Sequence, residues 1–183
     1  MGSWGASTTD ESKPKYLTTE EKKDCFANTK GWTVPAGGNS NPDAEREVLV
    51  AIGDLSGATK LGSATISSVN LVTATFDKSD GGTVRAVVNY NEEVDVTGTP
   101  RVQLTNSRVG NNFNLGYTSG TGTNRLTFTL VIPADDAATD AGDVLTLGVD
   151  ALNLNGGTIK DKGTETVSEI THSAGTGTFT VVA

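Results

Sequence analysis

The fold is decided by residues 84–104, which read VRAVVNYNEEVDVTGTPRVQL. Apolar and polar residues alternate here, and four apolar residues share one face of an extended chain: Val84, Ala86, Val88 and Tyr90. A Thr-Gly-Thr-Pro turn follows at 97–100, and the alternation resumes with Val102 and Leu104. Alternation with period 2, broken by a turn, predicts two antiparallel strands that each place one face in a core.

The same pattern continues toward the C-terminus in three more sets: Leu115 and Tyr117; Leu126, Phe128, Leu130 and Ile132; Leu145, Leu147 and Val149. Glycine- and asparagine-rich turns separate the sets at 80–82, 110–112, 120–122 and 155–157. A spacing of about ten residues for each strand and its turn is typical of sandwiches of antiparallel sheets. We therefore predict an all-β domain.

The first residues have a different composition. Residues 1–45 are polar and predict an extended arm with one short helix over about residues 19–28, in which Thr18 and Glu21 have capping-box spacing. The segment 33–44 is predicted to be a loop. The β-sandwich domain is predicted to span residues 46–183, with its first strand over 47–52.

Charge and cysteine content exclude several classes of function. The chain of 183 residues has a net charge of −8 and no cluster of Lys or Arg, which disfavours binding to nucleic acid or to an anionic membrane. Cys25 is the only cysteine, so no internal disulfide can form. Residues 1–25 contain no apolar run that would indicate a secretory signal.

Four segments follow one another in a specific order: YNEEVDVTGTPRVQL at 90–104, NLGYTSGTG at 114–122, LTFTL at 126–130 and ALNLNGGTIKD at 151–161. Together they resemble a bacterial immunoglobulin-like module of large surface proteins and adhesins, over about residues 63–165. The resemblance implies an immunoglobulin-like antiparallel β-sandwich. It implies no activity, because such modules act as spacers, ligand-binding tips and shell decorations.

The opening of the chain carries a second resemblance. Trp-Gly-Ala-Ser at 4–7, Asp-Glu-Ser-Lys-Pro-Lys at 10–15 and Asn-Thr-Lys-Gly-Trp at 28–32 resemble the start of structural proteins of tailed phages, particularly those of marine cyanobacteria. The resemblance covers about the first 35 residues. It implies a virion protein that reaches the particle surface by assembly.

No catalytic constellation is predicted. His172 has Ser168 and Ser173 nearby, but the chain lacks the Gly-x-Ser-x-Gly motif of a nucleophilic serine, so an exposed strand or loop histidine is the favoured interpretation. Cys25 is interpreted as a packing residue. Glu92 and Glu93 are interpreted as solvated acids in a turn. We predict a protein that is not an enzyme and has no cofactor.

An acidic segment is the candidate metal site. Four aspartates crowd residues 135–143, either in one helical turn or in a polar loop: Asp135, Asp136, Asp140 and Asp143. Calcium prefers such oxygen ligands. The spacing does not match an EF-hand, so solvated loop acids are the favoured interpretation, and no metal is predicted.

The arm is the predicted contact surface. A tryptophan in a polar arm buries about 200 Å² when it docks and is a common interface anchor. The predicted partner-binding residues are Trp4, Lys13, Pro14, Lys15, Tyr16, Phe26 and Trp32. For Trp32, packing back onto the sandwich is an equal alternative.

These features lead to one hypothesis and one alternative. The hypothesis is a decoration or cement protein on a phage head, which binds the major capsid protein or other virion proteins through the arm. The sequence leaves open whether the protein forms a homo-oligomer and whether it lies on the tail or baseplate instead. The alternative is a carbohydrate- or receptor-binding module of a phage fibre or bacterial adhesin. Sugar sites usually expose aromatics, whereas Phe113, Tyr117 and Phe128 are predicted to face inward, which favours the first hypothesis.

Overall fold

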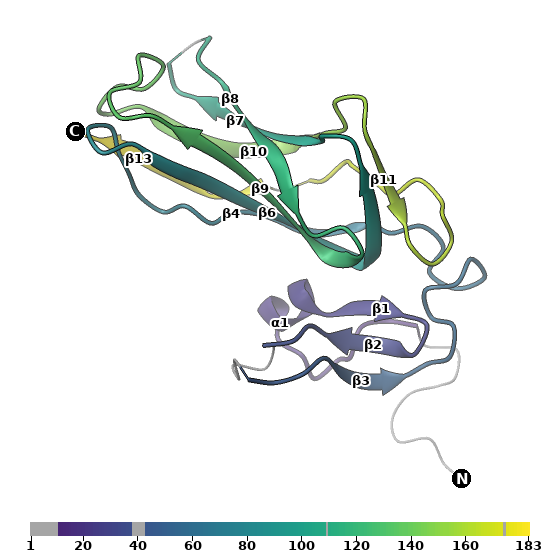
Figure 1. Cartoon of the computed structure of the whole chain (residues 1–183). Helices are drawn as coiled ribbons and strands as arrows, with labels where there is room; N and C mark the ends of the chain where they lie inside the picture. Colours follow the sequence, from purple (N-terminus) through teal and green to yellow (C-terminus); the bar gives the residue numbers. More distant parts are fainter. Residues whose placement is uncertain (1–10, 38–42, 109, 174) are drawn as a thin grey trace.

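The computed structural model describes residues 11–37, 43–108, 110–173 and 175–183. Within these ranges one short helix precedes the strands (Figure 1). The elements are α1 (Thr19–Asp24), β1 (Phe26–Asn28), β2 (Gly31–Val34), β3 (Glu47–Ala51), β4 (Ile66–Leu71), β5 (Phe76–Asp77), β6 (Gly82–Thr97), β7 (Arg101–Asn106), β8 (Phe113–Ser119), β9 (Thr123–Ile132), β10 (Val144–Asn153), β11 (Thr158–Asp161), β12 (Gly175–Thr176) and β13 (Thr178–Val182).

Strand β6 organises the whole molecule. It runs for 16 residues and pairs antiparallel with β4, β9 and β11 and parallel with β1. The pairing with β9 breaks between Asn89 and Val94, and the bridge to β1 lies inside this gap, at Glu92. β6 therefore joins the N-terminal elements to all the later strands.

The strands follow one continuous hydrogen-bonded path in the order β3-β2-β1-β6-β9-β8-β7-β10-β13-β5, with β4, β11 and β12 attached at its sides. Most neighbours are antiparallel, as short hairpin connections require. The prediction of an all-β protein is confirmed.

The main core is built from the alternating faces that the sequence predicts. Leu104, Leu115, Leu126, Phe128 and Leu145 are each fully buried, while Tyr117 and Leu130 are half-buried and pack against the cluster. A buried aliphatic or aromatic side chain of this size contributes about 1.5–3 kcal/mol relative to an exposed one. This core is the main source of stability of the strands from β4 to β13, here called the β-domain.

Val149 is an exception to the alternation. It was predicted to share a face with Leu145 and Leu147, but its side chain is 63% exposed. The register between β10 and β7 shifts between Leu147 and Leu152, and Asp150 in this interval has a φ of 49°. Such a bulge reverses the faces of the following residues, so Val149 points outward and Leu152 returns to the core.

The predicted helix begins as expected and ends early. The Thr18 hydroxyl accepts a hydrogen bond from the Glu21 amide, and the Glu21 carboxylate accepts one from the Thr18 amide, which is the predicted capping box. The helix ends at Asp24, however, and residues 26–28 form β1. The reason is burial: Cys25, Phe26 and Ala27 are consecutive and all inaccessible, and a helix with one packed face cannot bury three residues in a row.

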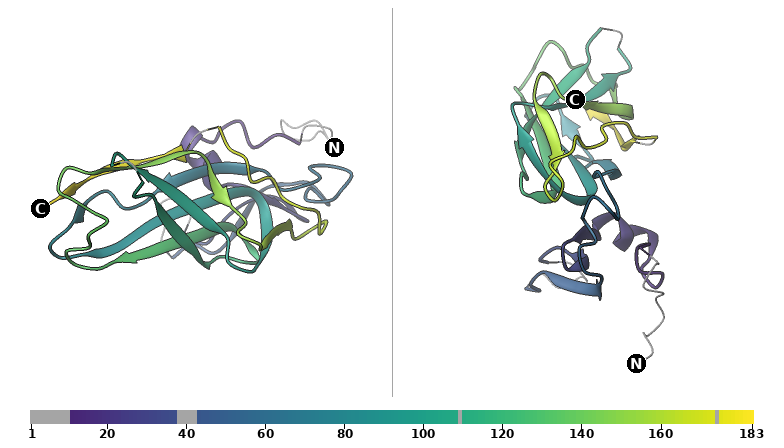
Figure 2. Two further views of the ribbon diagram at one scale, coloured as in Figure 1. Left: turned by 90° about the horizontal axis from the view of Figure 1, so that it is seen from above. Right: turned by 90° about the vertical axis from the view of Figure 1, so that its right-hand side faces the viewer.

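The remaining N-terminal elements differ from the predicted extended arm. β1, β2 and β3 form an antiparallel meander, and a second core cluster includes Leu17, Cys25, Trp32, Val34 and Leu55. The sequence interpretation missed it because its apolar residues lie on both sides of residue 46. We call residues 11–37 and 43–62, with this core, the N-terminal module; it lies against one side of the β-domain (Figures 1 and 2).

Candidate interaction surface of the N-terminal module

Trp32 and Phe26, two of the predicted anchors, pack within the chain. Trp32 is 3% exposed, and its indole Nε1 donates to the Glu11 carbonyl oxygen at 3.2 Å. Phe26 is fully buried, with the Arg46 guanidinium 5.1 Å from its ring centroid. The prediction that these two residues contact a partner is therefore corrected: both are buried within this chain, on opposite faces of the β1–β2 hairpin. Trp32 packs in the second core cluster and not on the core of the β-domain.

Lys13 fastens the first described residues to the rest of the chain. Its Nζ donates to the Lys22 carbonyl oxygen at 2.6 Å and to the Ser67 hydroxyl of β4 at 3.1 Å, and it lies 5.7 Å from the centroid of the Trp32 ring. Burial lowers the pKa of Lys13, and its electrostatic interactions with Cys25 and Asp24 offset part of this effect. Lys13 therefore acts within the chain.

Cys25 lies beside Lys13 and is inaccessible. Burial raises the pKa of its thiol to about 11, although the charge of Lys13 and a hydrogen bond from the Thr33 backbone act in the opposite direction. A thiol with this pKa is neutral at pH 7 and a poor nucleophile. The geometry agrees with its interpretation as a packing residue.

An exposed turn remains for contacts with a partner. Pro14 and Leu17 are buried and hold its two ends, and the Leu17 amide donates to the Pro14 carbonyl oxygen at 3.3 Å. Between them Lys15 and Tyr16 are exposed, and Tyr16 has 69% of its surface accessible. Of the predicted contact residues, these two present their side chains to solvent. Trp4 lies outside the described residues.

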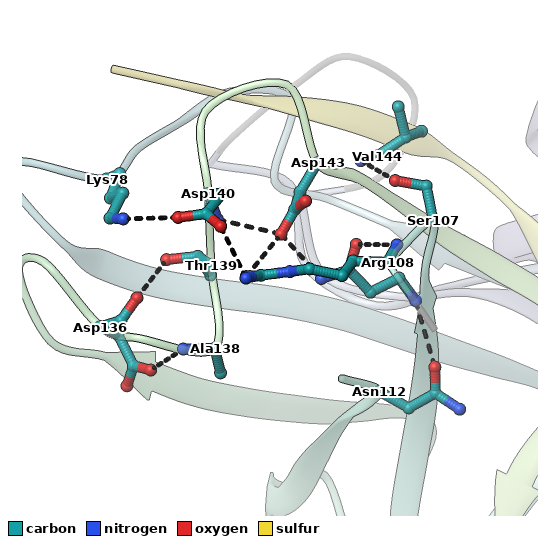
Figure 3. Close-up of polar contacts among 11 residues, drawn as sticks. Lys78, Ser107, Arg108, Asn112, Asp136, Ala138, Thr139, Asp140, Asp143 and Val144 are labelled. Carbon is teal, nitrogen blue, oxygen red and sulfur yellow. Dashed lines mark hydrogen bonds and ion pairs between the residues drawn. The ribbon is translucent and has the colours of Figure 1, made fainter. Parts of the chain in front are cut away.

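The acidic segment 135–143 forms a loop in which two of the four aspartates form ion pairs (Figure 3). Asp140 contacts Lys78 at 2.8 Å and Arg108 at 2.6 Å, and Asp143 contacts Arg108 at 3.1 Å. The hydrogen bond from Lys78 and the charges of Arg108 and Lys78 hold the pKa of Asp140 below its usual value. These cations bind both oxygens of Asp140 and one oxygen of Asp143.

Asp143 is the buried centre of this network. Burial opposes ionisation of Asp143, but the hydrogen bonds from Asn106 and the Asp140 amide, with the charge of Arg108, outweigh it and leave its pKa below the ordinary value. No group of three or more His, Cys, Asp or Glu side chains that could hold a metal occurs in the part of the chain that the structure describes.

His172 lies in an open groove of about 660 Å³ together with Asp150, Glu169 and Ser173. Its Nε2 accepts a hydrogen bond from the Ala151 amide at 3.0 Å, and its own amide donates to the Asp150 carboxylate at 2.8 Å. A ring nitrogen that accepts from the backbone is not placed to take a proton from a serine. The contacts of His172 fix the 171–173 segment against β10.

A second groove, of about 390 Å³, crosses the outer face of β7, β8 and β10. Polar side chains line it, including Arg101, Gln103, Asn114 and Asn153. Several of them bond to one another: Gln103 Nε2 donates to the Asn114 oxygen at 3.3 Å, and Arg101 donates to Asn155. Phe113 and Phe128 are buried, as predicted, and Tyr117 packs edge-on against Phe128 with the ring centroids 5.8 Å apart.

The sequence interpretation missed a buried carboxyl pair. Glu92 was predicted to be solvated in a turn, yet it lies in β6 with no exposed surface, as does Asp161 at the end of β11. The alternation of β6 contains the signal, since Glu92 follows Val88 and Tyr90 on the same face. Its environment raises the pKa of Glu92 to about 8, through burial first and then through the charge and hydrogen bond of Asp161.

Comparisons of this chain with protein families, with curated proteins and with solved structures find no match. Among the described residues no helix has the length and apolar character needed to cross a membrane.

Proposed function

We propose that this protein is a structural protein of a tailed-phage virion, a decoration or cement protein that binds the capsid lattice through its N-terminal module and displays the β-domain on the particle surface. The observation that carries the proposal is the exposed Lys15–Tyr16 turn. Tyr16 leaves 69% of its surface accessible although the turn is fixed at both ends by buried residues. A rigid, exposed aromatic next to a cation is typical of interface anchors.

We also infer that the β-domain is an immunoglobulin-like sandwich. The support is that strands far apart in the pairing order share one core: Phe76 of β5 and Phe179 of β13 belong to the same cluster as Val84 of β6. A sheet path whose distant strands meet across a core must fold back on itself, as in sandwiches.

A protein without catalytic activity fits this proposal. The strongly perturbed carboxyl of Glu92 has no exposed surface, so no substrate reaches it. Two acids of the 135–143 loop, Asp140 and Asp143, are bound by Lys78 and Arg108. Contacts repeated over a lattice give avidity, so each copy needs a modest surface.

Co-sedimentation tests the proposal. Phage heads assembled after deletion of the gene are incubated with purified wild-type protein and pelleted, next to Tyr16→Ala and the control Val131→Ala, which changes an equally exposed residue of β9. We expect wild type and Val131→Ala to pellet with the heads and Tyr16→Ala to bind at least about tenfold more weakly. Failure of the wild-type protein to pellet would refute the proposal.

The polar groove on β7, β8 and β10 favours carbohydrate binding as the second candidate. Amide and guanidinium groups such as those of Gln103, Asn114 and Arg101 are suited to sugar hydroxyls. A specific hit on a glycan array that is lost in Gln103→Ala would favour this candidate over capsid binding.

A further inference from the structure

Glu92 and Asp161 form a carboxyl pair that is sealed from solvent. Both residues are 0% exposed. Asp161 pairs with Val94 of β6, which lies on the same buried face of that strand as Glu92, and the charge and hydrogen bond of Asp161 contribute to the raised pKa of Glu92. One Asp161 oxygen, Oδ1, accepts from the Thr164 amide at 2.7 Å and from the Thr164 hydroxyl at 3.2 Å. Both Glu92 oxygens and Asp161 Oδ2 have no hydrogen-bond donor in the described part of the chain.

A single shared proton relieves the repulsion between the two carboxylates. Two neighbouring ionised carboxylates with no donor at three of their four oxygens repel each other, and burial adds the cost of removing each charge from water. With one proton between them, the protonated carboxyl donates to the other, and two of the three unpaired oxygens gain a partner. Burial and the neighbouring charge raise the pKa of Glu92 to about 8, so the proton is held at neutral pH.

The charged groups around the pair are paired with one another. Glu93, the next residue in β6, binds Arg46 at 2.8 Å and Lys162 at 3.8 Å. On the side of α1, Asp24 accepts a hydrogen bond from Asn89 at 3.3 Å. Arg46 and Lys162 therefore compensate the negative charge of Glu93 at the surface, while the shared proton compensates the charge of the buried pair.

The pair lies where the N-terminal module meets the β-domain. Ala27 of β1 is the bridge partner of Glu92. The turn after Asp161 packs so closely against the module that a Cβ on Gly163 would lie 2.7 Å from the Ser56 carbonyl oxygen, and the Thr164 hydroxyl oxygen lies 3.4 Å from the Gly62 carbonyl oxygen. Water reaches the two carboxyls when this junction opens.

We propose that Glu92 and Asp161 form a proton-dependent latch: while they share one proton the N-terminal module stays packed on the β-domain, and loss of that proton opens the junction. In the closed state Glu92 keeps its proton up to about pH 8, whereas in the open, hydrated state its pKa returns toward 4.5. Opening therefore releases a proton between these two pH values. The opening equilibrium constant then rises tenfold for each pH unit in this window, by about 30-fold from pH 6 to 7.5, and levels off above pH 8.

Hydrogen exchange of the full chain measures this opening. Protection factors, corrected for the pH dependence of intrinsic exchange, are determined from pH 5.5 to 9 for peptides that contain β1 and β11, with β9 as the internal reference. We expect protection of β1 and β11 to fall tenfold per pH unit below pH 8 in wild type and to stay constant in Glu92→Gln. The matched control Glu93→Gln, which removes the adjacent surface acid, keeps the wild-type slope.

Three results would overturn the latch: a constant protection of β1 in wild type, the same slope in Glu92→Gln, or an equal slope in β9, which would mean global unfolding. The same exchange experiment is repeated with calcium ions at pH 8. If calcium raises the protection of β1 and β11 in wild type but not in Glu92→Gln, the pair is a cation site and not a proton-dependent latch. If Glu92→Gln does not fold, Asp161→Asn serves instead. This variant removes the charge that helps to raise the pKa of Glu92, so its pH range of opening must be narrower than that of wild type.

Discussion

Trp32→Ala is the substitution that most clearly separates a self-supporting N-terminal module from an arm that needs a partner. Trp32 is 3% exposed in the second core cluster and donates a hydrogen bond to the Glu11 carbonyl. Truncation of a buried aromatic to alanine costs about 3–5 kcal/mol. Trp32→Phe keeps most of the apolar contact and loses the indole hydrogen bond, so its cost is about 1–2 kcal/mol.

The damage is expected to be local because Trp32 belongs to the second cluster and not to the core of the β-domain. Hydrogen exchange and urea denaturation of the isolated protein provide the assay. In Trp32→Ala the amides of β1 and β2 should lose protection while those of β9 keep it, and Trp32→Phe should fall between this variant and wild type. Val131→Ala, at a 69% exposed position, should change stability by less than about 0.5 kcal/mol. Wild-type protection of β1 and β2 in Trp32→Ala would refute the self-supporting module.

Three further substitutions test other parts of the structure. Arg108→Ala leaves Asp143 buried with one cation fewer and should lower the free energy of unfolding by about 1–3 kcal/mol. The lowered pKa values of Asp140 and Asp143 contribute stability that is present above pH 4 and lost as the pH falls through these pKa values. The variant should therefore lose less stability than wild type on acidification, and NMR titration should show a higher pKa for Asp143 than in wild type. Gly31→Ala places a methyl group against the Val50 carbonyl at a φ of 134°, and should destabilise the β2–β3 pair by more than about 1 kcal/mol in urea denaturation. Tyr90→Phe removes the hydrogen bond of 3.0 Å from the hydroxyl to the Glu169 carbonyl, and should lower the free energy of unfolding by about 1 kcal/mol, whereas an unchanged value would show that water replaces the bond.

The sequence predicts the β-domain well because its strands alternate strictly. Leu104, Leu126 and Leu145 lie in the core as their spacing requires. Val149 departs from its predicted face because a bulge is a property of two paired strands, and one strand's sequence does not display it.

The N-terminal module was harder to predict because its core is assembled from distant residues. Leu17 and Trp32 come from the segment interpreted as an arm, and Leu55 comes from beyond the first predicted strand. Each segment alone has too few apolar residues to indicate a core, and the cluster forms when β3 pairs with β2. Glu92 was missed for a different reason: acidic residues are almost always exposed, and this prior outweighed the alternation of β6.

A cryo-electron microscopy reconstruction of tailed-phage heads incubated with the purified protein tests the proposed attachment. We expect the N-terminal module to contact the capsid with Lys15 and Tyr16 at the interface, while the 135–143 loop points to solvent. A reconstruction in which the β-domain groove around Gln103 touches the capsid and the Tyr16 turn stays exposed would contradict it.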